Sequence, residues 1–262
     1  MGYSGIGGQA VMEGVMMKNG IHYAVAVRKP DKEIVVDARE YPGIVKNQKI
    51  KKIPILRGVI NFIDSLVLGM RTLMYSASFF DEEAKELSEE EQKAKEKKES
   101  VAMGFTVFLS VILALVIFML LPYGLSLFFK KWIASPTLLA LIEGVIRVVI
   151  FFIYIVAITC MEDIKRVYMY HGAEHKCINC IENGMELTVE NAKKQTMVHK
   201  RCGTSFMLVV MFVSILLFMF ISVPNMWVRM VLRILLIPVI AGISFEFISL
   251  AGKSENPVIN VL

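Results

Sequence analysis

The residues best suited to chemistry in this chain are gathered in one short polar segment. Three of its four histidines and three of its four cysteines fall between His171 and Cys202, a stretch of 32 residues. His171 and His175 are four residues apart, so on a helix both imidazoles project from one face and can bind one cation. Glu174 completes the H-x-x-E-H pattern of inverzincin metalloproteases, in which two histidines bind zinc and the glutamate activates water. The spacing predicts a divalent metal site, with zinc as the expected ion and Glu174 as the general base.

A second ligand pattern overlaps the first. Cys177-x-x-Cys180 and His199-x-x-Cys202 form two pairs separated by 18 residues, the arrangement of a structural zinc site with three cysteines and one histidine. A closed site with four protein ligands is structural. Two histidines with one further ligand would instead leave a position open for water, as catalytic zinc sites do.

The third ligand of such an open site stays undecided at this point. Cys180, His199 and Cys202 lie on the same segment as the two histidines. Glu246 is an ionisable group inside a long apolar stretch, which makes it a functional candidate by default. Glu13, in an unusual Gly- and Met-rich N-terminal segment, is a further candidate.

The elements that must position these residues are mostly apolar. Hydrophobic residues make up 55% of the 262 positions, and the mean hydropathy is +0.57. Each of the four long apolar segments is close to the ~20 residues that a helix needs to cross a bilayer. They cover residues 101–121 (ended by Pro122), 137–160, 205–223 and 228–251. The sequence predicts an all-α integral membrane protein with about four transmembrane helices and the lipid bilayer as its partner.

The positive charges predict how these helices are oriented. The first hundred residues carry 16 of the 29 Lys and Arg residues, and the polar segment 161–204 carries seven. Positive residues are retained on the cytosolic side, so we expect the N-terminus, this segment and the C-terminus there. Reduced thiols are then the default state of the cysteines. The net charge of +5, without a basic stripe interleaved with aromatic residues, argues against nucleic-acid binding.

The first hundred residues, ahead of the predicted spans, contain two further predicted elements. Alternating polar and apolar residues at 21–28 and 33–41 predict a small β-hairpin, the only strand signal in the chain. Residues 53–80 predict an amphipathic helix lying on the membrane or packed against the spans. As a simple span it would carry three charges, each costing roughly 2.5–3.5 kcal/mol at mid-bilayer. The Gly-rich residues 1–8 lack an apolar core, so we expect no cleavable signal peptide.

The expected organisation follows from these segments. It comprises a cytosolic Gly-rich segment and β-hairpin (1–52), an amphipathic interfacial helix (53–80), a charged helical linker (81–100), two transmembrane helices (101–160), the cytosolic His/Glu/Cys segment (161–204), two further transmembrane helices (205–251) and a tail (252–262). Inside the second span, Glu143 and Arg147 are four residues apart with opposite charges, which predicts that they neutralise each other.

Several motifs resemble one known family. They are residues 7–17 (GGQAVMEGVMM), 170–176 (YHGAEHK), 201–206 (RCGTSF), 241–247 (AGISFEF) and Asn256-Pro257. These motifs are similar to the YqhQ-like family of bacterial polytopic membrane proteins, a domain-of-unknown-function family described as predicted metal-dependent enzymes. The resemblance implies a location in the bacterial cytoplasmic (inner) membrane. Family members commonly have Thr at the position of Cys177, which favours the two histidines with Cys180, His199 or Cys202.

The leading hypothesis is a metal-dependent membrane enzyme, most simply a hydrolase, with its site at the cytosolic membrane face. The alternative is a non-enzymatic transporter or assembly factor in which a metal only stabilises the central segment. A third alternative is a metal-free scaffold that binds partners through its N-terminal part. A homo-oligomer is compatible with all three, and the sequence does not identify a substrate.

Overall fold

The computed structural model describes residues 4–45, 47, 49–80, 89–199, 202–221, 223 and 225–253. These residues belong to two compact units. One contains Met1–Phe79, Cys160–Val213 and Val223–Leu262, and the other contains Phe80–Thr159 and Ser214–Ser222. Most of the tail predicted at 252–262, with Asn256-Pro257, lies outside the described residues, as do residues 81–88 of the charged linker.

The first unit begins with an antiparallel sheet whose strands follow one another in chain order. They are β1 (Gly7–Val11), β2 (Gly14–Asn19), β3 (His22–Arg28) and β4 (Ile34–Glu40). The predicted hairpin is confirmed as β3 and β4, paired from His22↔Glu40 to Arg28↔Ile34. The prediction that it is the only strand pair was wrong, because β1 and β2 pair ahead of it.

The first unit also contains five α-helical elements among its described residues. They are α1 (Leu56–Ala77), α5 (Glu162–Glu182), the short α6 (Val189–Lys194), the first part of α7 (Gly203–Phe220) and α8 (Met226–Lys253). Of these, α1 and α5 pack on the sheet. Single 3-10 turns at Ile50–Lys52 and Ser78–Phe80 flank α1.

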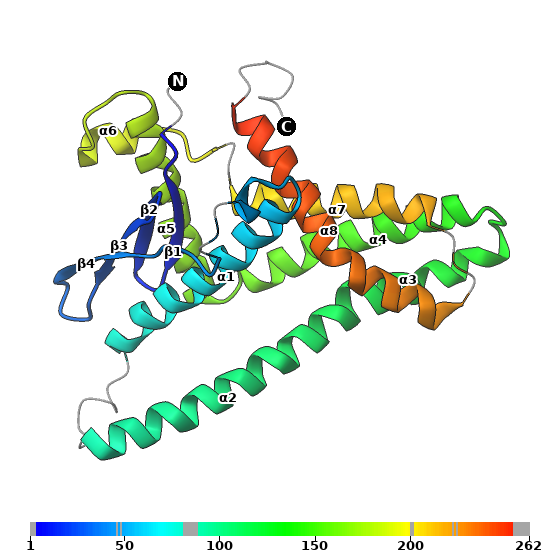
Figure 1. Ribbon diagram of the computed structural model, residues 1–262, viewed down its shortest axis with the longest axis horizontal. Coiled ribbons are helices and arrows are strands. Elements are labelled where there is room, and N and C mark those ends of the chain that lie inside the picture. Colours follow the sequence, from blue (N-terminus) through cyan, green and yellow to red (C-terminus); the bar gives the residue numbers. More distant parts are fainter. Residues whose placement is uncertain are drawn as a thin grey trace. The chain divides into compact units, whose positions relative to one another are not determined.

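Strand β1 was not predicted from the sequence, because both faces of this strand are covered. On one face, the side chain of Gln9 packs against Gly69 of α1, where a Cβ atom would collide with it. On the other face, Gly8 lies against Glu174 of α5. Successive residues of a strand point to opposite faces, so the sheet lies between α1 and α5 (Figure 1). A strand buried on both faces has no polar-apolar alternation to detect.

Helix α1 buries several polar side chains on the side that faces the sheet and its loops, and it leaves several apolar ones outside. Asp64 is buried and accepts hydrogen bonds from the Tyr41 hydroxyl (3.2 Å) and the Ile44 backbone N–H (2.7 Å). Ser76 is also buried and accepts one from the Met12 backbone N–H at 3.0 Å. The helix also packs on α8, where a Cβ at Gly58 would lie 2.8 Å from a backbone oxygen of α8.

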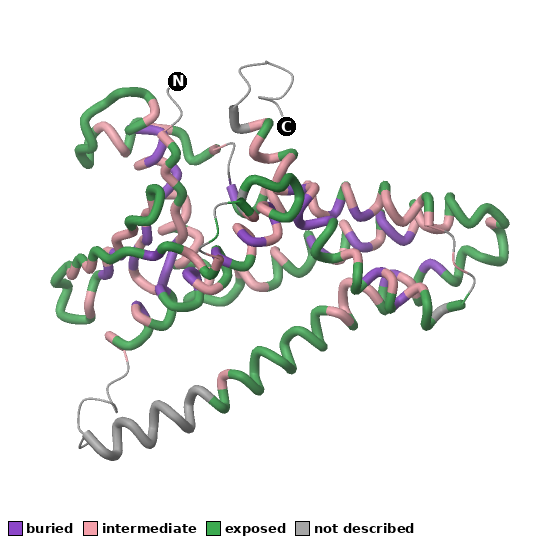
Figure 2. The backbone as a smooth tube through the Cα atoms, viewed as in Figure 1, coloured by how far each residue is buried: buried purple, intermediate pink, exposed green. Residues whose placement is uncertain are grey.

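Four helical segments are long and apolar enough to cross a membrane. They are Val101–Lys131, Pro136–Ile158, Gly203–Phe220 and Trp227–Ala251. The second of these is α4, and the first begins within α2 (Glu89–Leu115). Much of this part of α2 is exposed within the chain (Figure 2).

The predicted end of the first span at Pro122 was wrong. The helical path continues from α2 through a π-helical turn at Val116–Leu120 into α3 (Leu121–Ser126) and a 3-10 segment at Leu127–Lys131. Pro122 has no backbone N–H to donate, and the carbonyl oxygen of Phe118, four residues earlier, accepts a hydrogen bond from Arg147 instead.

The second unit contains a buried ion pair. Arg147 and Glu143 of α4 are 7% and 3% exposed, and their side chains meet at 2.9 Å. Arg147 also donates to the Phe118 carbonyl oxygen in the π-helical turn (2.9 Å) and to the Ser214 hydroxyl (3.2 Å). The pair thus joins three helical segments as well as neutralising its own charges.

Candidate metal centre

Helix α5 carries the H-x-x-E-H residues side by side. The ring centroids of His171 and His175 are 4.3 Å apart. The helix is continuous through Gly172, where a Cβ atom would lie 3.1 Å from the Met197 sulfur. The glycine therefore makes room for that sulfur without bending the helix.

Glu174 is directed at His171. Its carboxylate accepts a hydrogen bond from the His171 Nδ1 at 2.8 Å, and the residue is only 3% exposed. A Cβ atom at Gly8 of β1 would lie 2.6 Å from the Glu174 Oε1. The strand and the helix can approach this closely only because position 8 has no side chain.

Cys202 lies immediately before α7 and faces the two histidines. Its Sγ is 3.2 Å from the Nε2 of His171. Thr204 supports the sulfur with its hydroxyl at 2.8 Å and its backbone N–H at 3.4 Å. The thiol is buried, so these neighbours define its surroundings.

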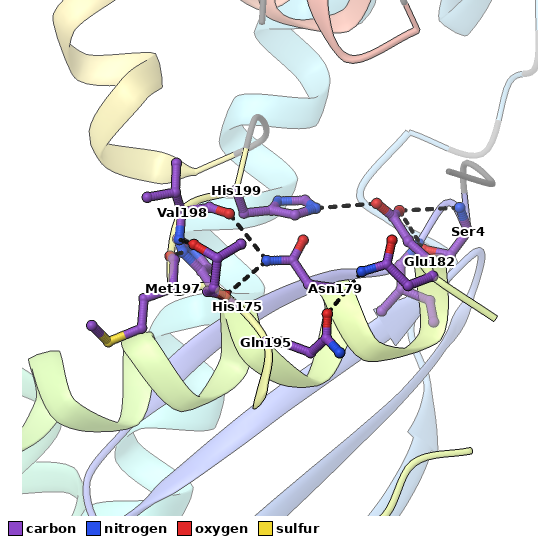
Figure 3. Close-up of polar contacts among 11 residues, drawn as sticks. Ser4, His175, Asn179, Glu182, Gln195, Met197, Val198 and His199 are labelled. Carbon is purple, nitrogen blue, oxygen red and sulfur yellow. Dashed lines mark hydrogen bonds and ion pairs between the residues drawn. The ribbon is translucent and has the colours of Figure 1, made fainter. Parts of the chain in front are cut away.

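His175 is oriented by a backbone carbonyl. Its Nδ1 donates to the Met197 oxygen at 2.6 Å. Asn179, one turn farther along α5, holds the same segment by donating to the carbonyl oxygens of Thr196 (2.9 Å) and Val198 (3.0 Å) (Figure 3). The Asn179 side chain thereby holds the segment whose Met197 carbonyl oxygen orients the His175 ring.

The two Nδ1 contacts decide which nitrogens are available. With each Nδ1–H donated to an acceptor, the Nε2 atoms of His171 and His175 are the nitrogens that could bind a cation, once deprotonated. One ligand atom from each histidine and the Cys202 sulfur lie within 4.8 Å of one another. Histidine nitrogen and cysteine sulfur are zinc ligands, and an imidazole whose second nitrogen meets a carboxylate or carbonyl is typical of metal sites. The residues therefore fit a zinc-type ion.

The same contacts shift the pKa values of the site. Burial by itself raises the pKa of the Cys202 thiol, but hydrogen bonds from His171, His175 and Thr204 outweigh it and lower that pKa to about 5. Hydrogen bonds to Cys202 and Glu174 raise the pKa of His171 to about 10. The metal-free site thus holds a thiolate beside an imidazolium at neutral pH. Because a cation would have to displace the imidazolium proton, metal affinity should depend on pH.

The turn between β1 and β2 is attached to α5 near this cluster. Glu13 has a positive φ of 50°, an unusual conformation for a residue with a side chain. Its two carboxylate oxygens bind the Arg166 guanidinium, and the Tyr170 hydroxyl donates to it at 3.1 Å. The hydrogen bond from Arg166 holds the pKa of Glu13 below its usual value. Glu13, a candidate ligand from sequence, is engaged in this contact.

Comparison with known proteins places the chain in a family. A family model described as "Protein of unknown function (DUF1385)" matches residues 53–262. The chain belongs to this family. The "Uncharacterized protein YqhQ" of Bacillus subtilis (strain 168) is 34% identical over 253 residues, which make up 95% of this chain and 80% of that protein. The YqhQ-like resemblance is confirmed, whereas the description of the family as metal-dependent enzymes stays a prediction. No solved structure matches the chain significantly.

The other predicted ligands of this DUF1385 chain lie outside the cluster. His199 has its Nε2 3.3 Å from a carboxylate oxygen of Glu182, which also accepts hydrogen bonds from Ser4 (Figure 3). The Cys180 thiol is buried and lies 3.4 Å from the Glu186 carbonyl oxygen. Each of these two side chains is held by groups near the C-terminal end of α5 or just beyond it.

Glu246 lies on α8 and binds Arg57 of α1 through both carboxylate oxygens. Its carboxylate therefore serves the α1–α8 contact. Of the candidates for third ligand among the described residues, Cys202 has its ligand atom within 4.8 Å of both histidines of this DUF1385 member. The His199 ring also lies beside His175, with the centroids 5.7 Å apart, but its Nε2 contacts Glu182.

Three supporting features were not predicted: Gly8 behind Glu174, the Met197 carbonyl oxygen on His175, and Asn179. The Gly7-Gly8 pair was visible in the sequence, but nothing there indicated which side chain it accommodates. A backbone carbonyl has no sequence signal at all, since every residue has one.

Proposed function

We propose that this protein is a membrane-bound, metal-dependent enzyme, most simply a hydrolase, with a zinc-type ion held by His171, His175 and Cys202. One observation carries the proposal: the two Nδ1–H groups are committed to Glu174 and to the Met197 carbonyl oxygen, which leaves both Nε2 atoms for an ion beside the Cys202 sulfur. Three protein ligands leave a coordination position open, as in catalytic zinc sites.

In this proposal, one set of residues binds the ion and another orients the ligands. The three ligands would bind the ion, while Glu174 and the Met197 carbonyl oxygen orient the two rings. The ion would supply a Lewis acid that brings the pKa of water towards about 7. Glu174 is within reach of His171, so its first role is to hold that ring, and its role as general base remains the prediction from the sequence motif.

We also propose that the chain crosses the bacterial cytoplasmic membrane four times, with this site at the cytosolic face. Support comes from the four long apolar helices and from the positive residues on either side of the site. Cys202 immediately precedes one of these helices, so its sulfur would lie close to the membrane surface. A substrate of this site would be reached from the cytosol or from the inner leaflet.

A second candidate function uses the thiol itself. The Cys202 sulfur is 3.2 Å from the His171 Nε2, and the His171 Nδ1 is 2.8 Å from Glu174. A nucleophile next to a base that is oriented by a third group is the arrangement of cysteine-dependent acyl transfer. In that case the protein would need no metal. The Cys202 thiolate would attack the acyl carbonyl and form a thioester, and the alcohol or amine of the substrate would leave with a proton from the His171 imidazolium.

Metal analysis of the full-length protein, purified in detergent without chelators, tests the first candidate. We expect about one zinc-type ion per chain in the wild type. The double variant His171→Ala/His175→Ala and the variant Cys202→Ser should lose the ion. His22→Ala and Cys160→Ser serve as matched controls, since both residues are exposed and outside the cluster, and both should keep it.

The outcomes separate the candidates. A wild type without metal that nevertheless forms a Cys202 acyl adduct, seen by mass spectrometry, would favour the thiol enzyme. Metal present in the wild type and lost equally from the control variants would contradict the proposed ligands. Glu174→Gln should weaken metal binding by about 10- to 100-fold if the carboxylate mainly orients His171. A wild type that holds the metal but hydrolyses none of the ester, amide and phosphoester probes, with a Glu174→Gln variant that behaves in the same way, would support the non-enzymatic alternative, in which the ion is structural.

A further inference from the structure

A separate cavity of about 420 Å³ lies between α1 and the outer strands of the sheet. Tyr23 of β3, together with Asp37 and Arg39 of β4, forms one wall, and Arg71 and Tyr75 of α1 form the other. None of these residues belongs to the His/Cys cluster, so the cavity does not depend on the function proposed above.

The cavity has an excess of positive charge. Arg39 is paired with Asp37 at 2.7 Å. Arg71 forms no ion pair within the described part of the chain, and its guanidinium instead lies over the Tyr41 ring at 5.7 Å from the centroid. Two guanidinium groups and one carboxylate leave a net charge of +1. A planar guanidinium without an acidic partner matches the geometry of phosphate oxygens.

The cavity also has unused hydrogen-bond donors. Among the residues that the structure describes, neither the Tyr23 hydroxyl nor the Tyr75 hydroxyl forms a hydrogen bond, although both residues line the cavity. Phenolic hydroxyls can donate to an anion. Arg71 and the two phenols therefore offer donors from both walls to one anionic group.

The outer side of α1 is apolar beside this cavity. Leu66, Met70, Leu73 and Met74 are 57%, 43%, 39% and 43% exposed, and Met74 also lines the cavity. The helix packs on α8, which contains one of the four segments long enough to cross a membrane. An apolar row next to a positive cavity suits a ligand with an anionic head and hydrocarbon chains.

We propose that this cavity binds the phosphate of an anionic phospholipid headgroup. Arg71 binds the phosphate oxygens, Tyr23 and Tyr75 donate to them, and the acyl chains lie along the exposed apolar row of α1. Arg39, already paired with Asp37, adds to the positive field without giving up its partner.

Titration calorimetry of the full-length protein in detergent tests this site with three probes: short-chain phosphatidylglycerol, phosphatidylcholine with the same chains, and glycerol phosphate. The wild type should bind phosphatidylglycerol saturably and more tightly than the other two. Arg71→Gln should weaken this binding by about tenfold or more, the effect of losing one hydrogen bond to a charged group. Arg28→Gln, which removes an exposed arginine outside the cavity, should bind like the wild type.

Equal phosphatidylglycerol affinity in Arg71→Gln and the wild type would overturn the proposal. Glycerol phosphate binding as tightly as phosphatidylglycerol would also overturn it, because the anion would then be a soluble phosphate. Arg39→Gln provides a second variant if Arg71→Gln does not fold, and it should also weaken binding, since it removes one of the two positive charges. The His171→Ala/His175→Ala variant should bind the lipid normally, which separates this site from the metal centre.

Discussion

Glu174 can hold His171 only because position 8 of the chain is a glycine. The carboxylate is buried between α5 and β1, and its Oε1 occupies the space where a side chain of residue 8 would begin. The neighbouring Gly7 has no atom within 4 Å of its Cβ position. The two adjacent glycines therefore have different roles, although they look alike in the sequence.

We predict that Gly8→Ala disturbs the metal centre and that Gly7→Ala does not. A methyl group at position 8 would displace Glu174 and break its hydrogen bond to His171, so metal affinity should fall by about 10- to 100-fold. Competition with a zinc chelator measures this affinity in both variants. Equal affinities in the two variants would show that Glu174 does not depend on the strand.

The protonation state of Cys202 gives a second test at this scale. Its pKa of about 5 means that the metal-free protein gains a thiolate as pH rises through about 5, well below the usual thiol range. The pKa of Cys177, by contrast, is raised by burial. Ultraviolet absorbance of the thiolate in chelator-treated protein should show a step near pH 5 that is missing in Cys202→Ser and kept in Cys177→Ser. In His171→Ala the step should move to higher pH, because the hydrogen bond from His171 to Cys202 is lost. A step that stays in place would contradict the contact between His171 and Cys202.

At the scale of elements, helices α1 and α4 both bury polar or charged side chains. Helix α1 buries Asp64 and Ser76 against the sheet and its loops together with the apolar Ile60 and Leu68, while an apolar row at Leu66, Met70, Leu73 and Met74 remains outside. A helix in water would do the reverse, so this orientation makes sense only if the outer side meets lipid or another apolar surface. Helix α4 buries its charges in a similar way, through Glu143 and Arg147.

We predict that Arg147→Met destabilises the protein strongly, by about 3–5 kcal/mol, because it leaves the buried Glu143 without its partner. The double variant Glu143→Leu/Arg147→Met removes both charges and should recover most of that stability. Reversible unfolding in mixed micelles would measure both. Equal losses in the single and double variants would mean that the contacts of Arg147 with Phe118 and Ser214, and not the ion pair, dominate.

At the scale of the whole molecule, the proposed topology determines which side of the membrane each part of the chain faces. The His/Cys cluster, the sheet and all of α8 belong to one compact unit, whereas α2 and α4 belong to the other. The proposed cytosolic site requires the sheet, the segment before α7 and the end of α8 to share one side of the bilayer.

Reporter fusions test that arrangement. Alkaline phosphatase inserted between α3 and α4, after residue 133, should be active, because it is active only outside the cytosol. Green fluorescent protein joined after the C-terminal residue should fluoresce, because it folds in the cytosol. If the internal phosphatase fusion were inactive and the C-terminal fluorescent protein dark, the orientation would be the reverse, and the His/Cys cluster would lie outside the cytosol.

The sequence alone determined what depends on neighbours along the chain. Apolar stretches of about 20 residues indicated the four long helices, alternation indicated the β3–β4 hairpin, and the i, i+4 spacing put His171 and His175 on one face of α5. Each of these signals lies within one element or one hairpin, where backbone geometry turns spacing directly into position.

Only the tertiary structure decided what comes together from different elements. Three features depend on how helices and strands pack: the position of Cys202 facing the two histidines, the pairing of Gly8 with Glu174, and the cavity at Arg71. Residue spacing carries no information about such contacts, because the chain between two elements can bring their side chains together or keep them apart. Strand β1, covered on both faces, became recognisable only when its two covering helices were in place.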